Sequence, residues 1–412
     1  MNTDTNFFYS KLFHPMGFII LYLFMSITTL QAQVPFFATI HLELLTLGGA
    51  LFLTLIHIFV VDKERITFNH PLSEALLIPL LYGIVPILTS LFSQDELKIF
   101  KDDEYKTLLE MILFGSALFY FMCQNSFQRF FLNIFTLFYV VFAGYFLYRY
   151  LILNEVREFD LRPLLKIRHG DPNFLCTFFS MMIPIPLMLF YTDLKKRYYL
   201  RSLMYLLASL LLLVCAYLTE SRMGIISVIV GLIYLMTRPV FKIPKKLLIV
   251  VALFLGSLIF FIRGERVLNR YTAINDLSNV NRVLTWENGL QVFLDNPLLG
   301  AGMHKASTFY YENTGYPHFQ SEFRELDVHN TFLKVLADLG LVGLLFFMLF
   351  YLWPICKATK MANDNRYFII CSFIILTLSI LTIGIPYKDL FVLHIFVLAS
   401  LTYSTKSEIL AT

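Results

Sequence analysis

Hydrophobic residues along this chain gather in long runs that short polar stretches separate. A helix needs about 20 mostly apolar residues to cross the hydrocarbon core of a bilayer. On that scale twelve runs stand out, and they lie near residues 15–31, 36–61, 72–92, 107–123, 130–151, 173–191, 198–218, 223–237, 246–262, 330–353, 367–384 and 389–404. The pattern predicts an all-α polytopic membrane protein with about 12 transmembrane helices.

The composition supports this class. Of the 412 residues, 58% are hydrophobic and 15% are charged, whereas an ordinary soluble domain has roughly 25% charged residues. The net charge of +4 is dispersed along the chain and does not indicate a nucleic-acid partner. The five cysteines fall in apolar runs without C-x-x-C spacing, which indicates small buried hydrophobes. Membrane lipids are therefore the expected surroundings.

Basic residues in the short loops predict the orientation of the helices. Lys and Arg resist translocation, so the loops at 192–201, 238–246 and 357–366 are predicted to be cytoplasmic. With twelve spans, both termini are then cytoplasmic. The predicted parts are helices one to nine within 1–262, a long outer loop at 263–329, helices ten to twelve within 330–404, and a cytoplasmic tail at 405–412.

Two outer loops differ from the rest. The loop at 263–329 is long and of mixed charge, which predicts a folded cap carrying short helices, one of them from Thr285 to Phe293. Asp295-Asn296-Pro297 is expected to end that helix. The loop at 152–172 is basic, and Arg168 lies in it. Cations on the outer side oppose the usual charge bias, so this loop invites a functional explanation.

Three residues near the outer helix ends could carry chemistry. Arg222 opens a predicted span, where a guanidinium near hydrocarbon needs an anion, such as Glu220 or a headgroup phosphate. Arg282 in the long loop could equally form an ordinary salt bridge. His329 precedes a span, and imidazole suits general acid or base work, although a polar residue is also common at a helix start.

The residues that follow His329 form a longer pattern. Asn330 comes next, then nine residues, Gly340, two residues and Gly343, which is H-N-x9-G-x-x-G. This pattern resembles the signature of bacterial O-antigen ligases and their relatives, the O-antigen polymerases and related oligosaccharyltransferases. Other segments resemble the family in the same order, namely Arg168 to Asn173, Ser221 to Gly224, Asn281 to Trp286, and Asp295 to Gly302. The resemblance covers residues 160–345, and elsewhere only the number of spans agrees.

The resemblance implies a glycosyltransferase of the bacterial inner membrane with its site on the periplasmic face. It would transfer a glycan, with inversion, from undecaprenyl diphosphate to a lipid A-core hydroxyl, without metal or other cofactor. Arg168, Arg222 and Arg282 would bind the leaving diphosphate, whose oxygens match guanidinium forks. His329 would accept the proton of the attacking hydroxyl. Asn330, Gly340 and Gly343 would support the motif structurally.

Other functions compete with this one. A polymerase of the same superfamily would share the donor, and the completeness of the His329 to Gly343 pattern favours the ligase. A flippase or transporter also fits twelve spans, but such proteins usually carry charges near the midplane and internal repeats. Neither is evident in the sequence. The polar cluster within a predicted span, His41, Glu43 and His57, is interpreted as a helix-packing or entry-groove feature. The acidic run from Asp102 to Glu104 is interpreted as a solvated cluster and not as a metal site.

Overall fold

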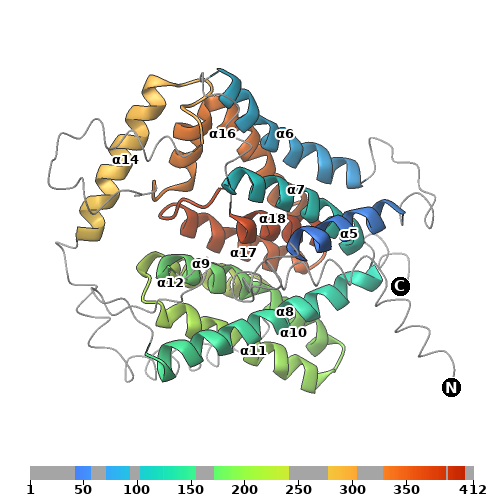
Figure 1. Cartoon of the computed structure of the whole chain (residues 1–412). Helices are drawn as coiled ribbons and strands as arrows, with labels where there is room; N and C mark the ends of the chain where they lie inside the picture. Colours follow the sequence, from blue (N-terminus) through green and yellow to red (C-terminus); the bar gives the residue numbers. More distant parts are fainter. Residues whose placement is uncertain are drawn as a thin grey trace.

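The computed structural model describes residues 42–56, 71–92, 103–123, 125–154, 171–240, 277–303, 328–386 and 388–403, and this part of the chain contains helices and no strand. The helices, drawn in Figure 1, are α5 (Leu42–Ile56), α6 (Pro71–Phe92), α7 (Asp103–Met122), α8 (Asn125–Leu147), α9 (Pro172–Met182), α10 (Pro184–Lys195), α11 (Tyr199–Leu218), α12 (Arg222–Met236), α14 (Leu277–Asp295), α16 (Thr331–Ala358), α17 (Asn365–Ile380) and α18 (Asp389–Leu401). A π-helical turn, Tyr148–Ile152, extends α8. The predicted all-α class is confirmed.

The helices form two groups that α17 joins. One group contains α5, α6, α7, α16 and α18, and the other runs from α8 to α12, as Figure 1 shows. Helix α17 packs against α9, α10 and α12 on one side and against α16 and α18 on the other. Chain segments far apart in sequence are therefore brought together around α17.

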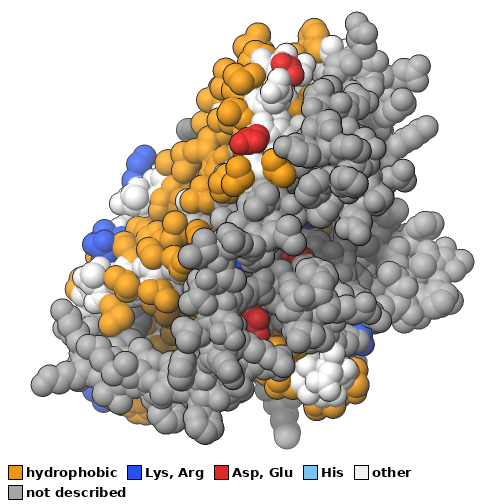
Figure 2. Space-filling model, turned by 90° about the vertical axis from the view of Figure 1, so that its left-hand side faces the viewer, with side chains coloured by type: hydrophobic (Ala, Val, Ile, Leu, Met, Phe, Trp, Pro, Cys, Tyr) orange, Lys and Arg blue, Asp and Glu red, His pale blue; other side chains and the backbone are white. Residues whose placement is uncertain are grey.

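Many of these helices have the length and composition of membrane spans. Within the described residues, six stretches are long and apolar enough to cross a bilayer, and four shorter helices are also apolar. They match ten of the twelve predicted runs. The runs at 15–31 and 246–262 lie outside the described residues, so the count of twelve stays a prediction. Figure 2 shows the broad hydrophobic surface that such a protein presents, with few charged side chains in it.

Ion pairs gather the predicted cytoplasmic loops at one end of the bundle. They join Arg129 to Asp193 (2.7 Å), Lys195 to Asp364 (2.6 Å), and Lys357 to Glu74 (2.8 Å). These contacts link the starts of α6, α8 and α17 to the ends of α10 and α16. Hydrogen bonds from Lys195 and Tyr191 lower the pKa of the Asp364 carboxyl. The loops at 192–201 and 357–366 thus share one end, as their basic residues predicted.

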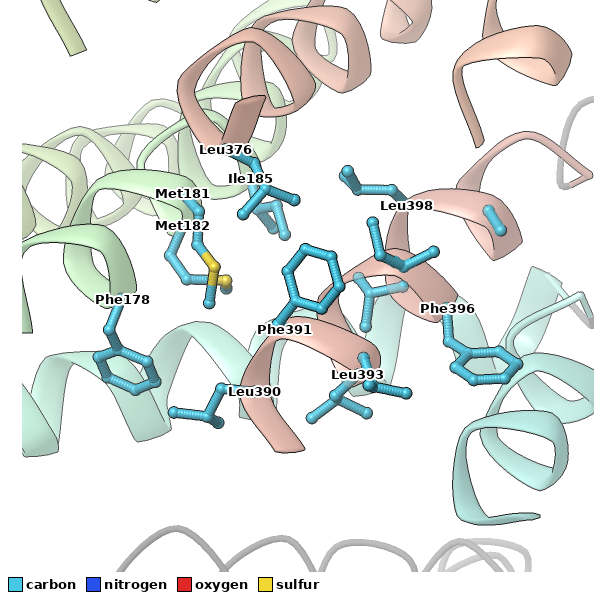
Figure 3. Close-up of a cluster of buried hydrophobic side chains, with 14 of the residues drawn as sticks. Phe178, Met181, Met182, Ile185, Leu376, Leu390, Phe391, Leu393, Phe396 and Leu398 are labelled. Carbon is cyan, nitrogen blue, oxygen red and sulfur yellow. The ribbon is translucent and has the colours of Figure 1, made fainter. Parts of the chain in front are cut away.

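A dense apolar core packs α18 of the first group against α9, α10 and α17. Phe391 of α18 lies in the middle of the cluster in Figure 3, among side chains from α9, α10 and α17. Its labelled neighbours include Phe178, Met181, Met182, Ile185 and Leu376, all of which are buried. Interiors of this density resist displacement of any one element. The core therefore restricts how α18 can move relative to these helices.

The long outer loop contains a longer helix than the sequence predicted. The expected helix from Thr285 to Phe293 is part of α14, which begins at Leu277 and ends at Asp295. The early start follows from apolar residues spaced three and four apart, Leu277, Val280 and Leu284, which continue the helical period. The end at Asp295 agrees with the prediction from Asp295-Asn296-Pro297. Residues 304–327 of this loop lie outside the described part of the chain.

Candidate functional site

The start of α16 is fixed by side chains on both sides of it. Asn330 caps the helix, because its side-chain oxygen accepts a hydrogen bond from the Leu333 amide at 3.1 Å. The Thr331 hydroxyl donates to the Ile383 carbonyl at 2.5 Å and accepts from the Ile385 amide at 3.1 Å. The segment between α17 and α18 therefore holds Thr331, the first residue of α16. His329 lies just before Asn330 and so next to this start.

Helix α14 reaches the same place from outside the bundle. The Trp286 indole donates to the His329 carbonyl at 3.1 Å. Gly289 lies against Val328, since a Cβ there would be 3.3 Å from the valine methyl groups. Arg282 is four residues before Trp286, so both project from the same side of α14. The structure thus brings Arg282 to the side of the molecule where His329 lies.

Arg222 lies at the same end of the bundle as His329, at the start of α12. It is the first residue of α12, directly after the turn that follows α11. Helices α12 and α17 run in opposite directions, with the Ser227 and Ser379 hydroxyls 3.1 Å apart. The start of α12 therefore lies beside the end of α17, next to the segment that holds Thr331. Arg222, Arg282 and His329, all half-buried, therefore lie at the same end of the bundle, opposite the basic loops.

The first half of α16 ends at a break in the backbone. The sequence predicted one continuous span at 330–353, but Gly340 has φ 65° and ψ −164°. In an unbroken helix the amides of Leu341 and Val342 would donate to the carbonyls of Ala337 and Asp338. The break removes both of these bonds. Broken helices are tolerated within a membrane only where other groups satisfy the freed backbone atoms.

The segment at 297–302 supplies those missing partners. It accepts from the two freed amides and donates to the two freed carbonyls, through four backbone bonds of 2.9–3.1 Å. They are Leu341 N to Pro297 O, Val342 N to Leu298 O, Ala301 N to Ala337 O, and Gly302 N to Asp338 O. The Thr89 hydroxyl at the end of α6 also donates to the Leu299 carbonyl at 2.8 Å. This segment is therefore an integral part of the broken helix.

Glycine is required where the two backbones meet. A Cβ at Gly340 would lie 2.4 Å from the Leu298 carbonyl group, and one at Gly300 would lie 2.4 Å from that of Asp338. Both glycines also have positive φ, which side chains disfavour. At Gly343 a Cβ would lie 2.1 Å from the Leu339 Cβ. The glycine at 340 therefore allows the segment at 297–302 to pack against α16, whereas the close contact at Gly343 is with a residue of α16 itself.

The comparison with known families agrees with this geometry. Residues 207–348 match the family model described as O-antigen ligase. This region of the chain is similar to that family. The matched region begins in α11 and ends in α16, so it includes Arg222, Arg282, His329 and Gly340. A search of curated proteins finds no match for this chain.

The matched region also buries two charged residues that the sequence interpretation missed. Lys334 and Asp338 are 2% and 0% exposed, and their spacing of four places them on one face of α16. They lie between His329 and the break at Gly340. The sequence could have indicated them, because two opposite charges four residues apart within a predicted span are costly unless they are paired or functional. Both charges lie near the start of the predicted span at 330–353, before the break at Gly340.

Some residues of the predicted site lie outside the described part of the chain. Arg168 and most of the loop at 152–172 belong to this group. The end of that loop is defined by Asp171, which caps α9 by accepting from the amides of Asn173 (2.8 Å) and Phe174 (3.3 Å). Among described residues, no three His, Cys, Asp or Glu side chains group as metal ligands, and Asp102 lies outside them.

Proposed function

We propose that this protein is an O-antigen ligase, which transfers a glycan from undecaprenyl diphosphate to a lipid A-core hydroxyl. One observation supports the proposal: Arg222, Arg282 and His329 belong to three separate elements, lie at the same end of the bundle, and fall within the region that matches the O-antigen ligase family. Two guanidinium groups and an imidazole are the kinds of group that suit a diphosphate leaving group and a hydroxyl acceptor.

The proposed reaction assigns a role to each group. The acceptor oxygen attacks the anomeric carbon from the side opposite the diphosphate, so the bond to the leaving oxygen breaks and the configuration inverts. His329 takes the proton of the acceptor hydroxyl. Arg222 and Arg282, with Arg168 from the outer loop, hold the negative charge that develops on the diphosphate. The permanent charge of three Arg makes a metal unnecessary in this scheme.

The proposed side of the membrane follows from charge. The basic loops lie at the end of the bundle opposite the candidate site. If those loops are cytoplasmic, as the bias of Lys and Arg indicates, the site faces the periplasm of a bacterial inner membrane. A glycan built on a lipid carrier and a lipid A-core acceptor would both present their sugars there.

A polymerase and a flippase are the competing proposals. The buried charges of Lys334 and Asp338 are the observation that supports a flippase, since transporters use charged residues within their spans. Analysis of lipopolysaccharide and of carrier-linked glycan in a strain lacking this chain separates all three. The ligase proposal predicts bare lipid A-core together with long polymer on the carrier. Core with a single repeat would indicate a polymerase. Bare core with single repeats on the carrier would indicate a flippase. Either of the last two results contradicts the ligase.

A further inference from the structure

Helix α14 has one packed side and two kinds of exposed side. The packed side faces α16 and carries buried Thr285, Gly289 and Val292. One exposed side is polar and carries Glu287, Gln291 and Asp295. The other exposed side is apolar and carries Val283, Leu290 and Leu294, which are 50%, 49% and 64% exposed. The exposed surface of α14 is thus divided lengthwise into a polar and an apolar half.

The apolar half continues directly onto α16. Leu298, which is 66% exposed, follows α14, and its carbonyl accepts from Val342. The residue beside it, Leu341, is 49% exposed and begins a line of exposed leucines along α16. We call the whole line the leucine ridge, and it consists of Leu290, Leu294, Leu298, Leu341, Leu345 and Leu349. The α16 part of the ridge belongs to a candidate membrane span.

We infer that α14 lies in the membrane interface, with its part of the leucine ridge among lipid acyl chains and its polar side in water. The inference rests on continuity, because the α14 part of the ridge joins the part from Leu341 to Leu349, which lies on a candidate membrane span. Figure 1 shows α14 running across the direction of α6 at this end of the bundle. A helix with one apolar and one charged side lies along the interface.

This placement sets the depth of the site, a consequence that rests on the proposed function. Arg282 and Trp286 project from α14 between its packed side and its apolar side. If the apolar side is held in acyl chains, Arg282 is held at the level of the lipid headgroups. The diphosphate of a lipid-linked donor lies at that level, so the anchored helix presents a guanidinium to it without extracting the lipid.

Spin labels at two neighbouring positions test the inference. Leu294→Cys and Gln291→Cys variants are made in the full-length protein with Cys123 and Cys356 replaced by Ser, because the remaining cysteines that the structure describes are buried. Each variant is labelled in phospholipid nanodiscs, and relaxation by oxygen is compared with relaxation by a water-soluble nickel chelate. Oxygen concentrates in lipid and the nickel chelate stays in water. Leu345→Cys serves as the reference for a position in the hydrocarbon.

The expected result is that oxygen relaxes the label at 294, with loss of the nickel effect, while nickel relaxes the label at 291. Strong relaxation of the 294 label by nickel would place this side in water and overturn the inference. Weak relaxation of the 294 label by both reagents would mean that protein, from this chain or a second copy, covers the ridge, and would also overturn it. The measurement needs no substrate, so its failure is separate from failure of the proposed function.

Discussion

At the scale of single residues, the sequence identified candidate site residues by their type and by their order along the chain. Arg222, Arg282 and His329 could be found because each belongs to a short motif or lies at the start of a predicted span. The structure places all three at one end of the bundle. Lys334 and Asp338 were missed because two charges in a long apolar run still leave it apolar. Their burial depends on how α16 is surrounded, which a linear pattern does not contain.

Replacing the arginines tests their proposed role at the diphosphate. Arg222→Ala and Arg282→Ala should each lower the rate of glycan transfer by about 10²-fold or more, because each removes charge from the leaving group. Arg→Lys should also transfer slowly, since a point charge loses the paired hydrogen bonds. The rate is measured with purified enzyme, and the amount of inserted protein is the control. A Lys variant at full rate would contradict bidentate binding of the diphosphate.

Replacing the histidine tests the proposed base. His329→Ala should lower transfer by roughly 10²- to 10⁴-fold, the usual contribution of a positioned base. The hydrogen bond from Trp286 uses the backbone carbonyl of His329, which the Ala variant keeps. Its thermal unfolding temperature should therefore stay close to that of the wild type. Unchanged transfer by His329→Ala would remove the base from the mechanism and leave the arginines alone.

At the scale of elements, most helices were predictable and the break in α16 was not. The runs at 72–92, 198–218 and 389–404 correspond to α6, α11 and α18, because length and hydropathy decide where a span lies. The break at Gly340 depends on the segment at 297–302, which lies about 40 residues earlier in the chain. No local pattern in α16 predicts that two of its amides donate to a remote loop.

Substitution at Gly340 tests the broken helix. Gly340→Ala places a methyl group 2.4 Å from the Leu298 carbonyl and forces a side chain into positive φ. The strained backbone alone costs about 1–3 kcal/mol, so the unfolding temperature in detergent should fall. Gly144→Ala in α8 is the matched control, because no atom lies within 4 Å of its new Cβ. Equal unfolding temperatures for the two variants would contradict the close contact between 297–302 and α16.

At the scale of the whole molecule, orientation follows from charge while assembly follows from packing. Basic loops predicted one end of the bundle, and ion pairs such as Lys195 with Asp364 gather there. The position of α17 between two groups of helices was not predictable, since it depends on which apolar surfaces fit together. The candidate site lies at the other end of the bundle, where α12 and α16 begin and where α14 packs against α16.

Reporter fusions test this orientation. A fusion after Met303 should give active alkaline phosphatase, because that enzyme needs the periplasm to form its disulfides. A fusion after Met361, in the basic loop between α16 and α17, should give active β-galactosidase instead. Reversed activities would place the candidate site in the cytoplasm. A lipid A-core acceptor with periplasmic sugars would then be out of reach.

The central claim is that this chain itself transfers a lipid-linked glycan to a lipid acceptor. The most direct measurement mixes purified protein in detergent with undecaprenyl-diphosphate-linked glycan and lipid A-core, in excess chelator. The account predicts that the wild-type protein forms lipopolysaccharide as fast in chelator as it does with added metal. The Arg282→Ala and His329→Ala variants should form almost none. Failure of the wild-type protein to join the two substrates, or transfer that stops under chelation and returns with magnesium, would contradict it.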